Sequence, residues 1–178
     1  MLCKICGSDE IESFQTFDKK TYWKCLYCKG KFLDESYLPS SVDEQKRYLE
    51  HNNEINDPEY RSFLSKLVIP LKEKILPNSI GLDFGCGHGP ALADILKKDG
   101  FKVLLYDPFF YPDKDVLTQQ YDFITCTETV EHFHNPWKEF NTLNTILKPN
   151  GWLGVMTSFL TSDAMFENWY YRRDPTHV

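Results

Sequence analysis

The chain has 178 residues, of which 42% are hydrophobic and 26% are charged. These values are typical of a folded domain with its own core plus a small appendage, and they exclude a disordered chain. The net charge of −6 disfavours a protein that binds nucleic acid through a basic face. No apolar run approaches the roughly 20 residues that span a bilayer, and the first residues lack a signal-peptide pattern. We therefore expect a cytoplasmic protein with no membrane partner.

Residues 1–34 carry two Cys-x-x-Cys pairs that are separated by 18 residues. Four thiolates at this spacing favour a closed, structural Zn²⁺ site, so we expect residues 1–34 to form a zinc ribbon, in which Gly7 or Gly30 would let the backbone turn tightly. A redox-active pair would leave the second pair unexplained, whereas iron in a rubredoxin-like site stays open as an alternative. The predicted metal ligands are Cys3, Cys6, Cys25 and Cys28.

Between the two pairs, residues 11–23 alternate in the manner of a short hairpin with a polar turn at residues 18–20. A piece of this size folds only when metal binding supplies stability, on the order of 10 kcal/mol in comparable peptides. Residues 35–78 follow as a helical connector and cover. Ser41 and Glu44 predict a capping box for a helix toward His51, and a second, amphipathic helix follows.

Residues 79–178 alternate between strand and helix patterns, which predicts an α/β domain with a parallel, Rossmann-like sheet. A further weak strand is expected near Val116, and Asn135 is the expected cap of the second helix. The other predicted strands are 80–84, 102–106, 121–127 and 152–157, and the predicted helices are 91–98 and 136–147.

The first of these strands ends in an Asp-x-Gly-x-Gly-x-Gly sequence that runs from Asp83 to Gly89. Glycines at a strand-to-helix turn let a ligand approach the backbone closely. A dinucleotide fingerprint would place the third glycine three residues after the second, and a P-loop would end in Gly-Lys-Ser/Thr, so neither pattern fits. A glycine-rich turn without a ligand is the alternative.

Four segments together resemble class I S-adenosylmethionine (AdoMet) methyltransferases, in particular the group related to ubiquinone and menaquinone methylases. They are Leu-Asp-Phe-Gly-Cys-Gly, Tyr-Asp-Pro, Tyr-Asp-Phe-Ile-Thr-Cys-Thr-Glu-Thr-Val-Glu-His-Phe and Leu-Lys-Pro-Asn-Gly-Trp-Leu, within residues 57–178. The resemblance implies AdoMet as the cofactor. The residues expected to bind it are Asp83, Gly85, Cys86, Gly87, Asp107, Pro108, Thr127 and Glu128.

Asp107 follows the second strand 22 residues after Gly85, close to the interval at which an acid binds ribose hydroxyls in related sheets. A simple turn residue before Pro108 is its alternative reading. Asp115 is a weaker candidate for the adenine edge. The aromatic residues 109–111 could face a cationic cofactor, although packing is the more common role of such residues.

Glu131 and His132 follow the strand that ends at Thr127, and both are predicted catalytic residues. A neutral imidazole could act as the general base for a hydroxyl acceptor. Alternatively, the pair orients the loop. Some quinone-pathway O-methyltransferases with a similar segment are thought to bind a divalent cation there, which would here involve Glu128, Glu131 and His132.

The segment 166–178 resembles a block that follows the fifth strand in the same family. Its aromatic, basic and histidine side chains are candidates for a substrate pocket, with an arginine pairing an anionic group. A surface loop with a salt bridge is the alternative. The candidates are Tyr171, Arg172, Arg173 and His177.

Class I sheets end in an antiparallel pair of strands, for which too few residues follow Thr157. We expect either a shortened chain or a partner, such as a second copy, that covers the sheet edge. The acidic charge favours a small-molecule acceptor. An RNA methyltransferase with a zinc ribbon and a noncatalytic AdoMet-binding scaffold with a docking ribbon stay as alternatives.

Overall fold

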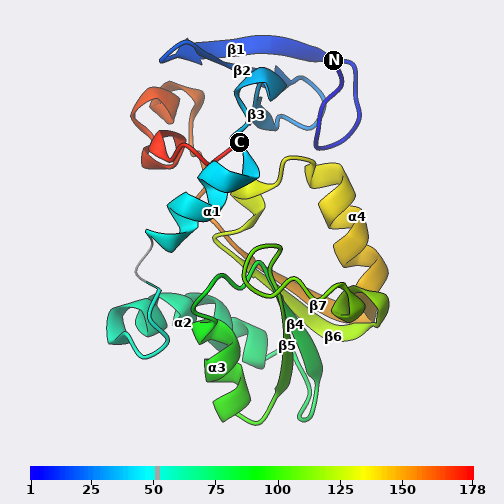
Figure 1. Cartoon of the computed structure of the whole chain (residues 1–178). Helices are drawn as coiled ribbons and strands as arrows, with labels where there is room; N and C mark the ends of the chain where they lie inside the picture. Colours follow the sequence, from blue (N-terminus) through cyan, green and yellow to red (C-terminus); the bar gives the residue numbers. More distant parts are fainter. Residues whose placement is uncertain (51–52) are drawn as a thin grey trace. The chain divides into compact units, whose positions relative to one another are not determined.

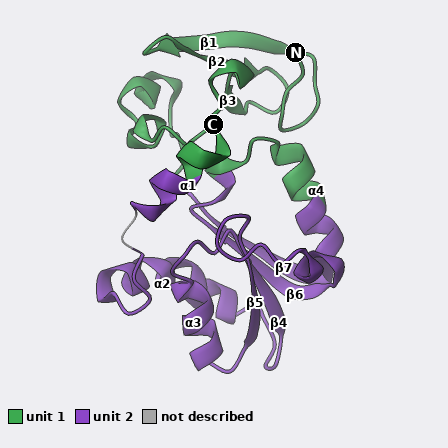
Figure 2. Ribbon diagram, viewed as in Figure 1, with its two compact units in different colours: residues 1–44, 131–141, 158–178 green, residues 45–130, 142–157 purple. Residues whose placement is uncertain are grey.

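A computed structural model of the chain describes residues 1–50 and 53–178 (Figure 1). Its contacts divide it into two compact units, shown in Figure 2. Unit 1 comprises residues 1–44, 131–141 and 158–178, and unit 2 comprises residues 45–130 and 142–157. The predicted domain boundaries after residues 34 and 78 divide the chain differently and stay a prediction. The predicted helix end at His51 lies outside the described residues.

A parallel four-stranded sheet forms the centre of unit 2, which confirms the predicted α/β, Rossmann-like class. The chain enters at β4, adds β5 on one side and then crosses to place β6 on the other, so the order is β5-β4-β6-β7. Ligands of such sheets bind beyond the carboxyl ends of the strands where the order reverses, here beside β4 and β6. The strands are β4 (Ile80–Phe84), β5 (Lys102–Tyr106), β6 (Tyr121–Thr127) and β7 (Leu147–Met156).

Two helices share one apolar core with this sheet (Figure 1). Helix α2 (Pro58–Lys72) is capped by the side chain of Asp57, and α3 (Ala91–Lys98) follows the glycine turn. Their buried faces contact Val103 of β5 and Phe123 of β6. Burial of such residues stabilises unit 2 by about 25 cal/mol for each Å² of apolar surface removed from water. No described helix combines the length and apolar character needed to cross a membrane.

Two local predictions are wrong. Residues 114–118 form a 3₁₀ helix, η2 (Lys114–Thr118), instead of a strand near Val116, because the Asp113 side chain accepts the N–H of Asp115 and starts a helical turn. Helix α1 (Ser41–Leu49) is capped by Ser40, whose hydroxyl accepts the N–H of Asp43 at 3.3 Å, so the predicted cap Ser41 is already helical. Asn135 does cap α4 (Pro136–Ile146).

Unit 1 contains the antiparallel sheet β1 (Ile11–Phe17), β2 (Lys20–Cys25) and β3 (Lys31–Leu33). The predicted hairpin is confirmed: Asp18 and Lys19 both adopt positive φ, 50° and 67°, as a type I′ turn requires. The third strand was not predicted, because three residues carry too little periodicity.

The tail segment, residues 158–178, packs on this hairpin within unit 1. Phe166 is only 3% exposed. Its ring contacts the rings of Phe14 and Tyr22 at centroid distances of 5.2 and 4.9 Å. Asp163 pairs with Lys24 at 2.6 Å and with Lys31 at 2.8 Å. The tail and the hairpin therefore form one core. The tail includes η4 (Asp163–Asn168) and η5 (Tyr170–Arg173).

Candidate functional site

The glycine loop, residues 85–89, turns from β4 into α3 with Gly85 and Gly87 at φ of +75° and +63°. A Cβ on Gly85 would collide with the side chain of Thr129, whose hydroxyl donates to the Gly85 carbonyl at 3.1 Å. On Gly87 a Cβ would meet nothing within 4 Å. The first glycine is needed for close packing, whereas the second presents bare backbone to open space, as a ligand-binding turn requires.

Asp107 organises this loop from the end of β5. Its buried carboxylate accepts the N–H of Gly87 at 3.0 Å and those of Phe109 and Phe110 at 2.9 and 3.1 Å. The turn after Pro108 is thus shaped by Asp107, and the same carboxylate fixes the glycine loop. An ionised carboxylate has about four acceptor positions, so Asp107 retains capacity for a ligand hydroxyl.

Asp83 is buried at the end of β4, where the Thr125 hydroxyl donates to it at 2.7 Å. Burial raises the pKa of Asp83 to about 6, against the lowering effect of the hydrogen bonds from Thr125 and the Ala93 N–H. The carboxylate form is therefore destabilised by missing solvation. A cationic ligand nearby would restore it.

The carboxyl end of β6 supplies Thr127 and Glu128. The hydroxyl oxygen of Thr127 is buried and makes no hydrogen bond within the described residues. Such an orphaned group indicates a missing polar partner. Glu128 adopts φ of +49°, a conformation that costs on the order of 1 kcal/mol for a residue other than glycine, and its N–H donates to the Met156 carbonyl at 2.8 Å.

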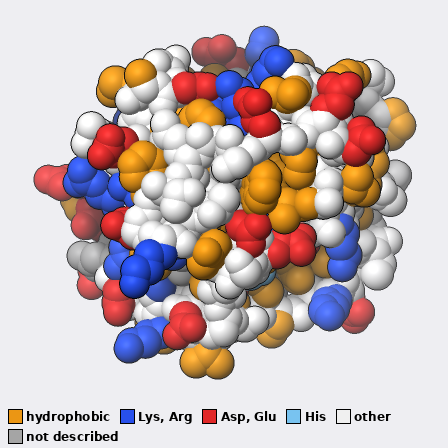
Figure 3. Space-filling view, turned by 90° about the horizontal axis from the view of Figure 1, so that it is seen from above, with side chains coloured by type: hydrophobic (Ala, Val, Ile, Leu, Met, Phe, Trp, Pro, Cys, Tyr) orange, Lys and Arg blue, Asp and Glu red, His pale blue; other side chains and the backbone are white. Residues whose placement is uncertain are grey.

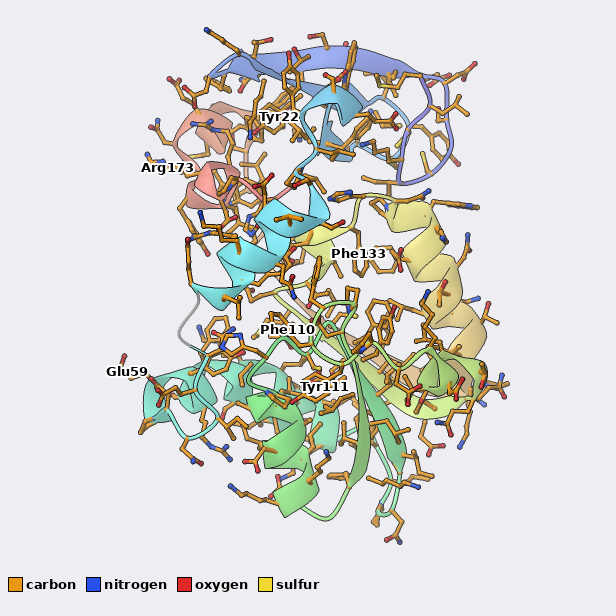
Figure 4. The ribbon with its side chains drawn as sticks, viewed as in Figure 1. Tyr22, Glu59, Phe110, Tyr111, Phe133 and Arg173 are labelled. Atoms are coloured by element: carbon orange, nitrogen blue, oxygen red, sulfur yellow. The ribbon has the colours of Figure 1, made fainter. Side chains whose placement is uncertain are left out.

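The aromatic residues after β5 make ring contacts within unit 2. Phe110 and Tyr111 lie in the loop beyond the carboxyl end of β5 (Figure 4). The Phe110 ring lies 5.5 Å from that of His88, and Phe109 lies 5.6 Å from Tyr48. Tyr111 pairs with Asp107 through two backbone hydrogen bonds. These rings pack against other rings at the edge of the glycine loop.

Unit 1 brings Glu131, His132 and His177 together, with one ligand atom from each lying within 4.8 Å of the others. The His132 and His177 ring centroids are 4.7 Å apart. His132 Nδ1 lies 3.0 Å from the Thr176 carbonyl oxygen, which can only accept, so Nδ1 carries the proton. The sequence predicts His177 in the substrate group, and Glu131 and His132 as catalytic residues or, together with Glu128, as ligands of a divalent cation. The group found in the described residues contains His177 in place of Glu128.

Four cysteine sulfurs also lie within 4.8 Å of one another in unit 1, and none forms a disulfide. The Cys3–Cys28 and Cys6–Cys25 sulfurs are each 3.7 Å apart. Four bonds of about 2.3 Å at tetrahedral angles place sulfurs about 3.8 Å apart, so the cluster has the dimensions of a tetrahedral metal–thiolate site.

Backbone N–H groups support the thiolates of this cluster. The N–H of Ile5 donates to Cys3 at 3.4 Å and that of Cys28 to Cys25 at 3.4 Å. Burial opposes ionisation of Cys25, but N–H groups of the turn lower its pKa to about 7. The left-handed residues of the two turns are Gly7 and Lys29, so the expected tight turn is confirmed at Gly7, and the expected role is wrong for Gly30. Gly30 is instead small because a Cβ would strike Ile5.

The substrate candidates in the tail differ in exposure. Tyr171 is buried, with its ring 4.6 Å from that of His177. Arg172 donates to the Glu167 carbonyl and lies over the Phe17 ring at 4.7 Å, so it packs the tail onto the hairpin. Arg173 is exposed (Figure 4).

Comparison with known families gives one match that decides the class. A family model described as a methyltransferase domain matches residues 53–178, which is more than half of the chain. The chain belongs to this methyltransferase-domain family. No curated protein matches it.

Among solved structures, this methyltransferase-domain protein is similar to CalO1, described as a methyltransferase in calicheamicin biosynthesis in its SAH-bound form. The identity is 14% and the TM-score is 0.41, over 78% of this chain and 50% of the CalO1 chain. The chain therefore spans about half the length of that neighbour.

Sequence reasoning missed Tyr60 as a site residue of the methyltransferase domain. Burial, together with the negative charges of Asp83 and Glu128, raises the pKa of the Tyr60 hydroxyl to about 12. Tyr60 therefore lies near the acids of the glycine-loop site. In the sequence, Tyr60 is one of several apolar residues at helical spacing, and this pattern predicts a buried helix face without indicating a function. Asp115, by contrast, is exposed in η2.

Proposed function

We propose that this chain binds AdoMet beyond the carboxyl ends of β4 and β6 and transfers its methyl group to a small-molecule acceptor. The observation that carries the proposal is the left-handed pair Gly85 and Gly87, with Asp107 bonded to the Gly87 N–H. Family membership supports the reaction class. When bound, AdoMet supplies an activated methyl group, so the protein needs mainly to align the acceptor and exclude water.

Several features of unit 2 fit this cofactor. Gly87 faces open space, and Asp107 retains acceptor capacity for ribose hydroxyls. The buried Thr127 hydroxyl, which makes no hydrogen bond within the described residues, could bond to a polar group of the cofactor. A cationic ligand near Asp83 would stabilise its carboxylate, which burial otherwise destabilises. Cys86 stays a predicted cofactor-binding residue, although its N–H already donates to the Tyr106 carbonyl at 3.3 Å.

His132 is the proposed general base, with Glu131 beside it. Because Nδ1–H donates to the Thr176 carbonyl, the lone pair is on Nε2, the nitrogen that would take a proton from an acceptor hydroxyl. General base catalysis of this kind accelerates a reaction by roughly 10²–10⁴-fold. Arg173 is the proposed partner of an anionic group on the acceptor, because Arg172 already packs against Phe17.

Zn²⁺ is the proposed occupant of the four-cysteine cluster. The sulfur separations of 3.7 Å match a tetrahedral thiolate site, and four protein ligands leave no position for a substrate. The ion would therefore be structural. It would stabilise a hairpin that contributes few buried residues of its own.

A small-molecule acceptor is favoured over RNA by charge. The net charge is −6, and basic and acidic side chains alternate over the face in Figure 3, with apolar side chains between them. Within the described residues, this face carries no continuous basic stripe of the kind that tracks a phosphate backbone. The acceptor, and the predicted partner that would cover the sheet edge, stay predictions.

Calorimetry with AdoMet and S-adenosylhomocysteine tests the proposal on a matched pair of variants. Gly87→Ala and Gly100→Ala each place a Cβ on a left-handed residue with nothing within 4 Å, at a similar backbone cost of about 1–2 kcal/mol. We expect Gly87→Ala alone to weaken binding by tenfold or more. Equal affinities in both variants, or no binding heat in the parent protein, would refute the cofactor site.

Production of S-adenosylhomocysteine with a panel of hydroxylated small molecules then tests catalysis. Turnover that falls by about 10²-fold or more in His132→Gln supports the base. Cofactor binding without turnover would favour a noncatalytic scaffold. Turnover with RNA, with binding that weakens steeply as salt is added, would favour the RNA alternative.

A further inference from the structure

The cluster of Glu131, His132 and His177 joins two segments of unit 1 that are far apart in the sequence. Glu131 and His132 lie in the turn η3 (Val130–His132), and His177 lies in the tail. The Val178 N–H donates to the Glu131 carbonyl at 3.0 Å, which fixes the tail against that turn. The backbone of the tail is therefore held against the turn that carries Glu131 and His132.

Neighbouring groups orient His132 in the way that metal-binding histidines are usually oriented. Its Nδ1–H donates to the Thr176 carbonyl, which leaves the lone pair on Nε2. Thr176 is only 1% exposed, and Asp174 accepts both its N–H at 2.9 Å and its hydroxyl at 2.6 Å. A backbone carbonyl so restrained fixes both the tautomer and the ring direction.

The donor set has a distinct chemical preference. Two imidazole nitrogens and one carboxylate oxygen favour a borderline divalent transition metal such as Zn²⁺ or Fe²⁺ over Mg²⁺ or Ca²⁺, which prefer oxygen. Ligand atoms about 2.1 Å from one ion lie at most about 4.2 Å apart. The observed limit of 4.8 Å needs only small side-chain rotations to reach that geometry.

We infer that Glu131, His132 and His177 form a second metal site, separate from the four-cysteine cluster, that takes a divalent transition-metal ion. Three protein ligands leave coordination positions for water or for an oxygen of a bound molecule. The four-cysteine cluster, by contrast, fills a tetrahedral ion with sulfur. The two sites in unit 1 thus differ in ligand chemistry and in openness.

A metal here would change the proposed role of His132 but not the cofactor site. With Nε2 bound to the ion, the imidazole cannot accept a proton. The ion would instead lower the pKa of a coordinated hydroxyl, as metal-bound water shows. This consequence rests on the proposed methyl transfer, whereas metal binding itself does not.

Cobalt titration of the metal-stripped full chain tests the inference. Sulfur-to-cobalt charge transfer reports the cysteine site, and weaker visible bands without charge transfer report the second site. We expect two equivalents in the parent protein, one in His132→Ala and in His177→Ala, and two in the matched control His134→Gln. In the control, the amide can keep the bond that His134 Nε2 makes to Glu44 at 3.0 Å.

Glu131→Gln is a conservative variant that preserves the size of the side chain. We expect it to lower the affinity for the second equivalent of cobalt by tenfold or more. Intact sulfur-to-cobalt charge transfer in each variant shows that the four-cysteine cluster still binds the metal, and unchanged hydrogen exchange of the tail amides shows that the tail is still folded. One equivalent in the parent protein, or two retained in both histidine variants, would overturn the inference. AdoMet affinity is measured separately, so failure of either proposal is distinguishable from failure of the other.

Discussion

Truncation of Phe166 is the sharpest test of how unit 1 is held together. Phe166 is only 3% exposed, and its ring lies 5.2, 6.1 and 4.9 Å from the rings of Phe14, Phe17 and Tyr22, measured between centroids. Phe→Ala changes at such sites cost about 3–5 kcal/mol, through lost burial and the cavity left behind. Because these contacts join the tail to the hairpin, we expect the substitution to weaken the packing of the tail on the hairpin.

Hydrogen exchange of tail amides measures this loss directly. A cost of about 3–5 kcal/mol raises the population of the open tail by roughly two to three and a half powers of ten. We expect this acceleration at the amides of Trp169 and Arg172, which donate to carbonyls within the tail at 3.2 Å. Amides of β4 and β6 in unit 2 should keep the protection of the parent protein.

Phe159→Ala is the matched control, because the same substitution removes a ring that is 82% exposed. Its effect should stay within about 0.5 kcal/mol. Unchanged tail exchange in Phe166→Ala would refute the shared core. A uniform acceleration across both units would instead show that the whole chain opens together.

Three further predictions concern charge, metal and the missed tyrosine. Because burial raises the pKa of Asp83 to about 6 from 3.8, the folded state holds the proton more tightly, so this group's contribution to the unfolding free energy is largest below about pH 4 and falls up to about pH 6. Denaturant titrations should show this fall reduced in Asp83→Asn. Cys25→Ser should release the ribbon metal and cost on the order of 10 kcal/mol of hairpin stability, seen as proteolysis confined to unit 1 with AdoMet affinity retained. Tyr60→Phe should weaken AdoMet binding by about 1 kcal/mol in calorimetry without changing the melting temperature by more than a few degrees; an unchanged affinity would remove Tyr60 from the site.

Local signals were sufficient for the elements that place the cofactor site. The strand at residues 80–84 and the helix at 91–98 were predicted with the bounds that the structure has. Their apolar runs are bounded by glycines, and such punctuation acts over a few residues. The strand predicted near Val116 was wrong because a single side-chain cap at Asp113 outweighs a weak apolar pattern.

Contacts between distant segments were not predictable. Phe166 reads as one aromatic residue among several, and nothing local indicates that it packs against Phe14. His177 and His132 were both selected from the sequence, but for different roles, because their 45-residue separation conceals their contact. Periodicity reports burial along one element and carries no information on which surface buries it.

The shared core gives the four-cysteine cluster a consequence beyond its own fold. Metal binding would order the hairpin, the hairpin buries Phe166, and Phe166 belongs to the same tail that supplies Thr176 and His177. A hairpin with so few buried residues cannot hold the tail unless its turns are fixed. Loss of the metal from the four-cysteine cluster should therefore loosen the contact between His177 and His132. On this prediction, the metal of the four-cysteine cluster stabilises the histidine cluster through the tail.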